Sequence, residues 1–158
     1  MKILVTYYSR TGTTRTVGEA LAKELGADSD EIIDLRKRTG LWPIRWLTAG
    51  RHSMRKKLTE IKTGKSPKDY DLIAIGTPIW ATKMTPAART YLTNQKLDGK
   101  KVALFCTCGG DEASAALEEM KTLISKAKVV ASVSFGRGDV KSGKYVEKVK
   151  SLAKSIRK

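Results

Sequence analysis

Side chains that commonly hold metal ions are scarce in this chain, which has one histidine, His52, and two cysteines, Cys106 and Cys108. The two cysteines are separated by one residue, a spacing too short for an ordinary structural disulfide, so reduced thiols are expected. Because His52 lies far from both thiols in the sequence, the three residues do not make a convincing metal site. We expect Cys106 to be a core residue and Cys108 to lie in a loop after a strand.

Long apolar runs are also absent. No stretch approaches the roughly 20 apolar residues that a membrane-spanning helix needs. The first expected strand follows directly after Met1 and Lys2, which leaves no room for a secretory signal peptide. We therefore expect a cytoplasmic protein. A length of 158 residues suits one domain with a sizeable core and is too short for two ordinary domains.

Acidic residues are in the minority, since 31 Lys and Arg stand against 16 Asp and Glu and the formal charge is +15. The excess lies in two segments. Residues 36–68 contain 11 basic residues and one acidic residue, and residues 139–158 contain seven basic and two acidic residues, whereas the rest of the chain is neutral. Such localised charge favours an acidic protein, an anionic membrane or nucleic acid as a partner, or it serves solubility alone.

Apolar strands and amphipathic helices alternate along the chain. We expect strands at 3–8, 30–35, 72–76, 101–106 and 129–135, loops at 77–85 and 136–143, and helices that end near residues 25, 61, 92, 124 and 156. Of these helices, the one over 43–61 lies in the basic segment. The run 72–76 is continuously apolar, as is typical of a strand covered by helices on both faces of a parallel sheet. The order of elements predicts an α/β fold with an open, doubly wound sheet of five parallel strands.

The turn Ser9-Arg10-Thr11-Gly12-Thr13-Thr14 links the first strand to the first helix. It brings several backbone N–H groups and four hydroxyls to the positive end of a helix dipole, which favours phosphate binding over a simple helix cap. The turn lacks the Gly-Lys-Ser/Thr ending of a nucleoside-triphosphate loop and the three glycines of a dinucleotide loop, although Asp34 stands where a ribose-binding acid would be. It also lacks a phosphatase cysteine, and Gly76-Thr77 replaces the acceptor aspartate of a receiver domain. These differences favour a small phosphate monoester.

These motifs, taken together, resemble the flavodoxin family. The first strand and Ser9–Thr14 look like its FMN-phosphate loop, Thr77-Pro78-Ile79-Trp80-Ala81 resembles its second flavin loop, and Thr107-Cys108-Gly109-Gly110-Asp111 stands at the position of its third. The resemblance implies a single flavodoxin-like domain over residues 1–158, of the short-chain branch, with strand order 2-1-3-4-5 and a basic helical insertion at 36–68. In such sheets the three loops meet beyond the carboxyl ends of the strands.

FMN is the cofactor that this resemblance implies. Its phosphate would be held by Ser9, Thr11, Thr13, Thr14 and the backbone from Arg10 through Gly12 to Thr14. Trp80 would stack on the flavin ring, and the backbone around Cys108–Gly110 would reach the pyrimidine edge. No catalytic residue is expected.

Three departures from the family pattern bear on function. Arg10 lies in the first loop and Arg15 directly after it, although the family usually binds the phosphate there with neutral groups. Either arginine could add a charge-assisted hydrogen bond to the phosphate, and we expect one of the two to face solvent instead. Gly109 and Gly110 replace the outer aromatic ring of many flavodoxins, which would leave one face of the flavin open. The basic surface, which contrasts with the usual acidic one, predicts a less strongly reducing flavin because positive charge stabilises the reduced anion.

Three functional hypotheses follow. The first is electron transfer with an acidic redox protein, the second is an FMN-dependent NAD(P)H or quinone oxidoreductase, and the third is a binding module without a flavin. The insertion is either a solvated face or a docking face for the acidic protein or an anionic membrane. Nucleic acid is a weaker candidate, because no recognition motif accompanies the charge.

Overall fold

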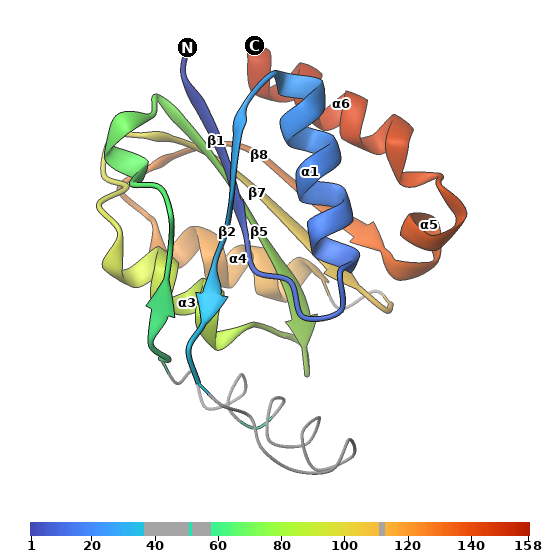
Figure 1. Cartoon of the computed structure of the whole chain (residues 1–158), viewed down its shortest axis with the longest axis horizontal. Coiled ribbons are helices and arrows are strands. Elements are labelled where there is room, and N and C mark those ends of the chain that lie inside the picture. The colour runs from blue at the N-terminus through green and yellow to red at the C-terminus, as the bar shows by residue number, and fades with distance from the viewer. Residues whose placement is uncertain (37–50, 52–57, 111–112) are drawn as a thin grey trace.

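The computed structural model describes residues 1–36, 51, 58–110 and 113–158. Five parallel strands form its central sheet, in the order β2-β1-β5-β7-β8 (Figure 1). Their bounds are β1 (Ile3–Tyr7), β2 (Asp28–Glu31), β5 (Leu72–Trp80), β7 (Lys101–Cys108) and β8 (Lys128–Gly136). The predicted fold class and strand order are therefore confirmed, since the five parallel strands follow the order 2-1-3-4-5 when they are counted along the chain.

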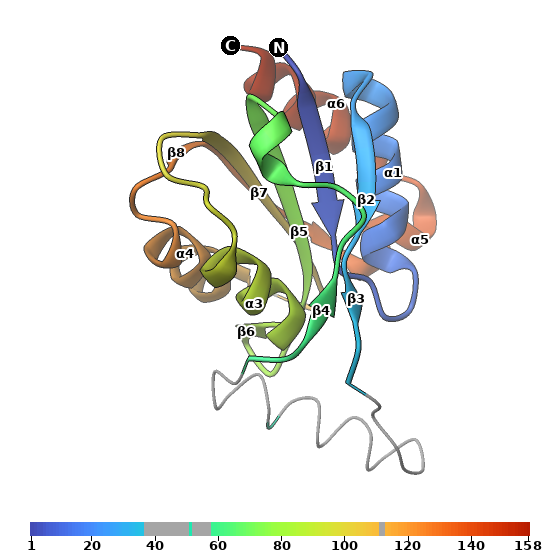
Figure 2. The ribbon, with the colours of Figure 1, turned by 60° about the vertical axis from the view of Figure 1, so that its left-hand side comes forward.

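Helices cover both faces of the sheet (Figures 1 and 2). One face carries α1 (Thr13–Leu25), α5 (Arg137–Ser142) and α6 (Tyr145–Arg157), and the other carries α3 (Pro86–Asn94) and α4 (Ala113–Leu123). Helix α1 ends at Gly26, as predicted, because a glycine adopts the left-handed φ of 62° there without steric cost. Among the described residues, no helix combines the length and the hydrophobicity needed to cross a bilayer.

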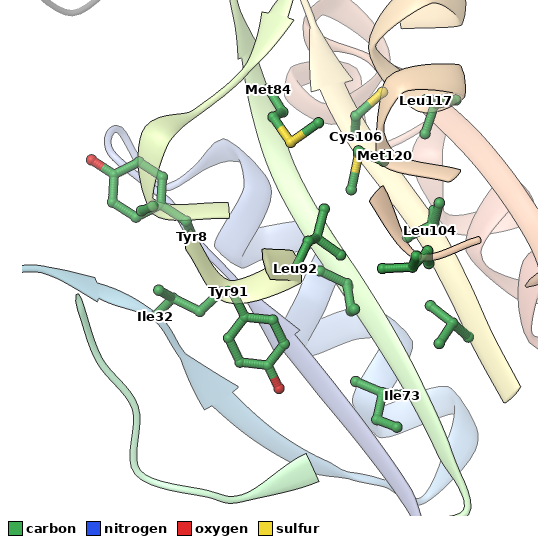
Figure 3. Packing of buried hydrophobic residues seen from close by; sticks show 14 of the residues in the cluster. Tyr8, Ile32, Ile73, Met84, Tyr91, Leu92, Leu104, Cys106, Leu117 and Met120 are labelled. Atoms are coloured by element: carbon green, nitrogen blue, oxygen red, sulfur yellow. The ribbon is translucent and has the colours of Figure 1, made fainter. Parts of the chain in front are cut away.

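The sheet separates two apolar clusters. Ile73, Leu104 and Met120 belong to the cluster beneath α3 and α4 (Figure 3), and Val5 and Phe105 belong to the cluster beneath α1 and α6. Strand β5 contributes to both, which explains why its sequence is continuously apolar rather than alternating. A buried ion pair between Arg89 and Glu119, with 3.0 Å between Nη2 and Oε2, also joins α3 to α4.

The second strand and the end of the insertion differ from the prediction. Strand β2 starts two residues earlier, and Ile33–Asp34 forms a separate strand, β3, antiparallel to β4 (Ile61–Lys62). Ile32 is buried, but Ile33 and Leu35 are about half exposed, at 47% and 46%. Most of the predicted helix over 43–61, together with His52, lies outside the described residues. Its predicted end is wrong, because Ile61 pairs with Asp34 in an antiparallel ladder.

Near the carboxyl edge of the sheet, predicted loops are replaced by regular structure. Strand β5 continues to Trp80 and turns back into β6 (Lys83–Met84), so the loop predicted at 77–85 is largely a hairpin. The loop predicted at 136–143 contains α5, which follows β8 directly. The helical spacing of apolar residues predicts that Leu123 and Val146 face the core, but they are 38% and 42% exposed. A 3₁₀ turn, η1 (Pro67–Asp69), precedes β5.

Candidate functional site

The carboxyl ends of β1, β5 and β7 meet at one edge of the sheet, where the chain forms an open pocket. The three segments singled out in the sequence and the start of α5 contribute its walls. The lining residues are Arg10, Thr11, Thr13, Thr14, Pro78, Ile79, Trp80, Thr107, Cys108, Gly109 and Arg137.

The first loop is folded around Ser9. Its Oγ accepts hydrogen bonds from the backbone N–H groups of Gly12 and Arg15, both at 3.2 Å. Gly12 has a φ of 92°, which favours glycine, and precedes α1 without giving it a side-chain cap. No acidic residue occupies the first turn of α1, so the positive end of its dipole is not offset locally by a carboxylate.

Threonine hydroxyls line this end of the pocket and link two of its walls. The buried hydroxyl of Thr14 lies 2.8 Å from the hydroxyl of Thr107, which joins the start of α1 to the end of β7. Thr11 and Thr13 place their hydroxyls 3.5 Å apart. Since a hydroxyl can donate as well as accept, this arrangement suits an anionic group rich in acceptor oxygens.

The two arginines of the loop point to different places. Arg15 is held away from the pocket by Glu31, with Nε–Oε2 and Nη2–Oε1 distances of 3.0 and 2.8 Å. This bond and the charge of Glu31 raise the pKa of Arg15 further. Arg10 lies over the ring of Trp80, with 5.2 Å between Cζ and the ring centroid. The guanidinium of Arg10 therefore belongs to the pocket wall.

Trp80 is almost fully buried, with 4% of its surface exposed. The ring of Tyr8 meets its ring edge to face, with a centroid distance of 5.8 Å and an interplanar angle of 79°. Beyond Trp80 the β5–β6 hairpin turns through Ala81 and Thr82, whose φ values of 48° and 66° are both left-handed. The second loop is thus a tight turn that holds an aromatic ring in the pocket wall.

Thr77 has a structural position next to this hairpin. It is fully buried, and its Oγ1 lies 3.0 Å from the Oγ1 of Thr85 and accepts a bond from the Thr85 N–H. The Thr85 hydroxyl in turn caps α3 by accepting a bond from Ala88 N–H. Thr77 therefore fixes the base of the hairpin rather than lining the pocket.

The third segment, which contains Gly109 and Gly110, leaves its side of the pocket open. Gly109 and Gly110 are exposed, and nothing lies within 4 Å of where a Cβ would stand on either one. The Cys108 thiol donates to the carbonyl of Gly110 at 2.9 Å. Cys106 is a core residue, as predicted, and burial raises the pKa of its thiol to about 12. Cys106 is therefore held as an unreactive thiol.

The pocket brings together ten of the sixteen residues proposed from the sequence. Ser9, Gly12, Thr77, Ala81 and Gly110 lie beside it without lining it, and Asp111 lies outside the described residues. Arg137 was missed. Its one available signal is that it directly follows the fifth parallel strand, whose carboxyl end lies at the same edge of the sheet as the other loops.

The chain forms an open doubly wound sheet with one pocket at its carboxyl edge. Hydroxyl groups, the start of a helix and an aromatic ring surround this pocket. These features together define a flavodoxin-like α/β protein. A family model described as flavodoxin matches residues 2–148. The chain belongs to the flavodoxin family, which confirms the resemblance inferred from its sequence and supports FMN as its cofactor.

Solved structures agree with this assignment. A putative flavoprotein from Bacteroides uniformis is 28% identical, with a TM-score of 0.80 and coverage of 97% of both chains. One from Bacteroides eggerthii is 26% identical, with a TM-score of 0.74 and coverage of 90% of this chain and 94% of its own. A Lactobacillus acidophilus flavoprotein, solved in complex with FMN, shares the fold at 23% identity and a TM-score of 0.74, over 89% of this chain and 97% of its own. Comparison with curated protein sequences finds no match.

Proposed function

We propose that this protein binds FMN in the pocket and exchanges electrons with an acidic redox protein. The observation that carries the proposal is the convergence of a hydroxyl-rich helix start, a buried tryptophan and an open glycine turn on one cavity. Arg10 and Arg137 are the only charged side chains among the described residues that line it. This lining fits an anionic cofactor with a planar ring.

The residues divide by the part of the cofactor they suit. Thr11, Thr13 and Thr14 and the N–H groups at the start of α1 would hold the phosphate, because they are hydrogen-bond donors at a positive helix end. Ser9 would act indirectly, by shaping the loop through its two backbone bonds. Trp80 and Ile79 would flank the ring, and Cys108 and Gly109 would border its polar edge.

Bound FMN supplies reversible transfer of one or two electrons. The chain's role is to hold the cofactor where a partner can approach it, and its charge of +15 favours a negatively charged partner at low ionic strength. An anionic membrane is a second docking surface for the basic insertion, and nucleic acid is disfavoured because no recognition motif accompanies it. We assign this activity to the cytoplasm.

A second function is favoured by Gly109 and Gly110. Their open surroundings leave room at the pocket for a small acceptor such as a quinone, so an FMN-dependent NAD(P)H or quinone oxidoreductase is the alternative. Steady turnover of a quinone with NAD(P)H and no partner protein would favour this alternative. A Gly109→Tyr variant should then lose turnover while keeping FMN, because the ring would cover the open side.

The first experiment is to record the visible spectrum of the purified protein and identify any flavin that it releases. Titration of the flavin-free protein with FMN, followed by flavin fluorescence, then tests the pocket. Loss of one hydroxyl in Thr13→Val should weaken FMN binding by roughly tenfold. The exposed α3 residue Thr93 provides the matched control Thr93→Val. A colourless protein that does not bind added FMN would support a binding module without a flavin.

The partner is tested separately. The flavin-loaded protein should bind an acidic ferredoxin, and the binding should weaken as salt rises. Neutral replacement of Arg55, Lys56 and Lys57 together should abolish it, whereas neutral replacement of Lys144, Lys150 and Lys154 should not. Binding that is insensitive to both salt and the first set of substitutions would contradict docking through the insertion.

A further inference from the structure

Three arginines lie near the pocket, and their surroundings separate their roles. Arg15 is paired with Glu31 outside it, and Arg10 covers the Trp80 ring. Arg137 lines the pocket from the start of α5 and is exposed at its rim. No carboxylate from the described residues lines the pocket, so an anion that enters it meets positive charge without a competing acid in the wall.

The register of the sheet places Arg137 near the hydroxyl-rich end. Gly136 pairs with Cys108 at the ends of β8 and β7, so Arg137 lies one residue beyond this pair. Thr107, which precedes Cys108, forms the hydroxyl contact with Thr14 at the start of α1. Helices α1 and α5 also contact each other and lie on the same face of the sheet (Figure 1). Since Arg137 is the first residue of α5, it lies on the side of the sheet that carries the start of α1.

We propose that Arg137 is a specificity residue that binds the phosphate of the cofactor and makes the pocket select FMN over riboflavin. The inference rests on the proposed binding of FMN. A guanidinium offers two parallel N–H donors to a phosphate, and such charge-assisted bonds are stronger than those from neutral hydroxyls. Riboflavin has the same ring without the phosphate, so Arg137 contributes nothing to its binding.

The test compares both ligands on the flavin-free protein. Arg137→Gln should weaken FMN binding by about tenfold to a hundredfold and leave riboflavin binding within about twofold. Arg137→Lys, which keeps the charge without the planar fork, should give an intermediate loss. The control is Lys141→Gln, which removes a positive charge from an exposed position of the same helix that does not line the pocket. It should change neither affinity.

Inorganic phosphate gives a second readout. It should raise the melting temperature of the flavin-free wild type and of Lys141→Gln more than that of Arg137→Gln. Equal weakening of FMN and riboflavin by Arg137→Gln would assign the residue to the ring instead, and unchanged FMN binding would remove its role altogether. If the wild type binds riboflavin and FMN equally well, phosphate selection is wrong while flavin binding stands. If it binds neither, the proposed function fails and this role fails with it.

Discussion

At the scale of single residues, Gly76 has little freedom to change. A Cβ at this position would stand 2.2 Å from the ring of Phe105, which is fully buried and packed edge to face against Phe135. Because Gly76 has no side chain, the ring of Phe105 on the neighbouring strand β7 can lie directly against the backbone of β5. Close packing in the core therefore requires a glycine here, two residues before Pro78, which lines the pocket.

We expect Gly76→Ala to lower the free energy of unfolding by about 2 kcal/mol, because the added methyl group would force the fully buried Phe105 ring to shift within the core. Gly109→Ala is the matched control, since nothing lies within 4 Å of its added Cβ. Urea denaturation of both variants measures the difference. Equal stabilities would show that the core around Phe105 relaxes freely.

Asp28 gives a prediction about pH. The Tyr70 hydroxyl donates to its carboxylate at 2.7 Å, and this bond, together with the charge of Lys65, lowers the pKa of Asp28. A lowered pKa stabilises the folded state at pH values above the unfolded value of about 3.9, and this contribution disappears as the pH falls through the folded value. Asp28→Asn should therefore be less stable than wild type at pH 7, and the gap should close toward pH 2.

Denaturant titrations at several pH values between these limits measure the gap. Asp69→Asn serves as the control, because it removes an exposed carboxylate that accepts no hydrogen bond from a tyrosine in the described structure. A gap that is constant with pH would show that the loss comes from packing rather than from the carboxylate.

At the scale of elements, the β5–β6 hairpin carries local strain. A two-residue hairpin turn of type I′ has left-handed backbone at both positions, and here those positions are Ala81 and Thr82. The left-handed region costs an ordinary residue roughly 1 kcal/mol, and asparagine and glycine much less. The strained turn follows directly after Trp80 and so lies beside the pocket.

The double variant Ala81→Asn/Thr82→Gly should raise the free energy of unfolding by about 1 kcal/mol or more. Thr93→Gly in α3, where the backbone is helical, should lower it by a few tenths of a kcal/mol, about the difference in helix propensity between threonine and glycine. The urea midpoints of the two variants should therefore move in opposite directions. A loss of stability in both would contradict the strain inferred for the hairpin.

Some elements follow from sequence patterns and others do not. The apolar runs of β1, β5 and β7 could be placed because burial on both faces leaves a continuous signal. The first loop could be placed because Gly12 and its hydroxyl neighbours mark a strand-to-helix turn. Strand β2 has the sequence Asp-Ser-Asp-Glu at the edge of the sheet, where backbone pairing with β1 suffices and no apolar pattern exists.

The candidate site was also predictable only in part. The pocket residues of the first three segments could be grouped, because carboxyl ends of parallel strands meet at one edge. Arg137 could not be distinguished from other basic residues near the C-terminus. Glycines at 136, 138 and 143 favoured a loop, and the helix between them depends on its contacts with α1 and β8.

At the scale of the whole molecule, positive charge should tune the bound flavin. A unit charge about 8–10 Å from the ring interacts with the reduced anion by roughly 2 kcal/mol at an effective dielectric near 20. Arg10 and Arg137 line the pocket, and the whole chain carries +15. We therefore expect a less strongly reducing flavin than the acidic surface of a typical flavodoxin would give.

A redox titration of the FMN-loaded protein measures this effect. Arg10→Gln should lower the potential by tens of millivolts, because it removes a positive charge that lies over Trp80 in the pocket wall. Lys158→Gln, at the far end of the chain, should leave it unchanged. A potential as low as that of an ordinary flavodoxin, unchanged by Arg10→Gln, would contradict the prediction.

The two ends of the chain lie together, on the side of the molecule opposite the carboxyl ends of β1 and β5 (Figures 1 and 2). The pocket lies at those carboxyl ends. Strand β1 runs from the first residues toward the pocket edge, and α6 returns to the starting side, where Arg157 donates to the Glu24 carbonyl at 2.7 Å. A tether attached to either end would therefore leave the pocket facing outward. The protein could be fused to an enzyme or fixed to an electrode through its termini with its pocket still presented to the solution.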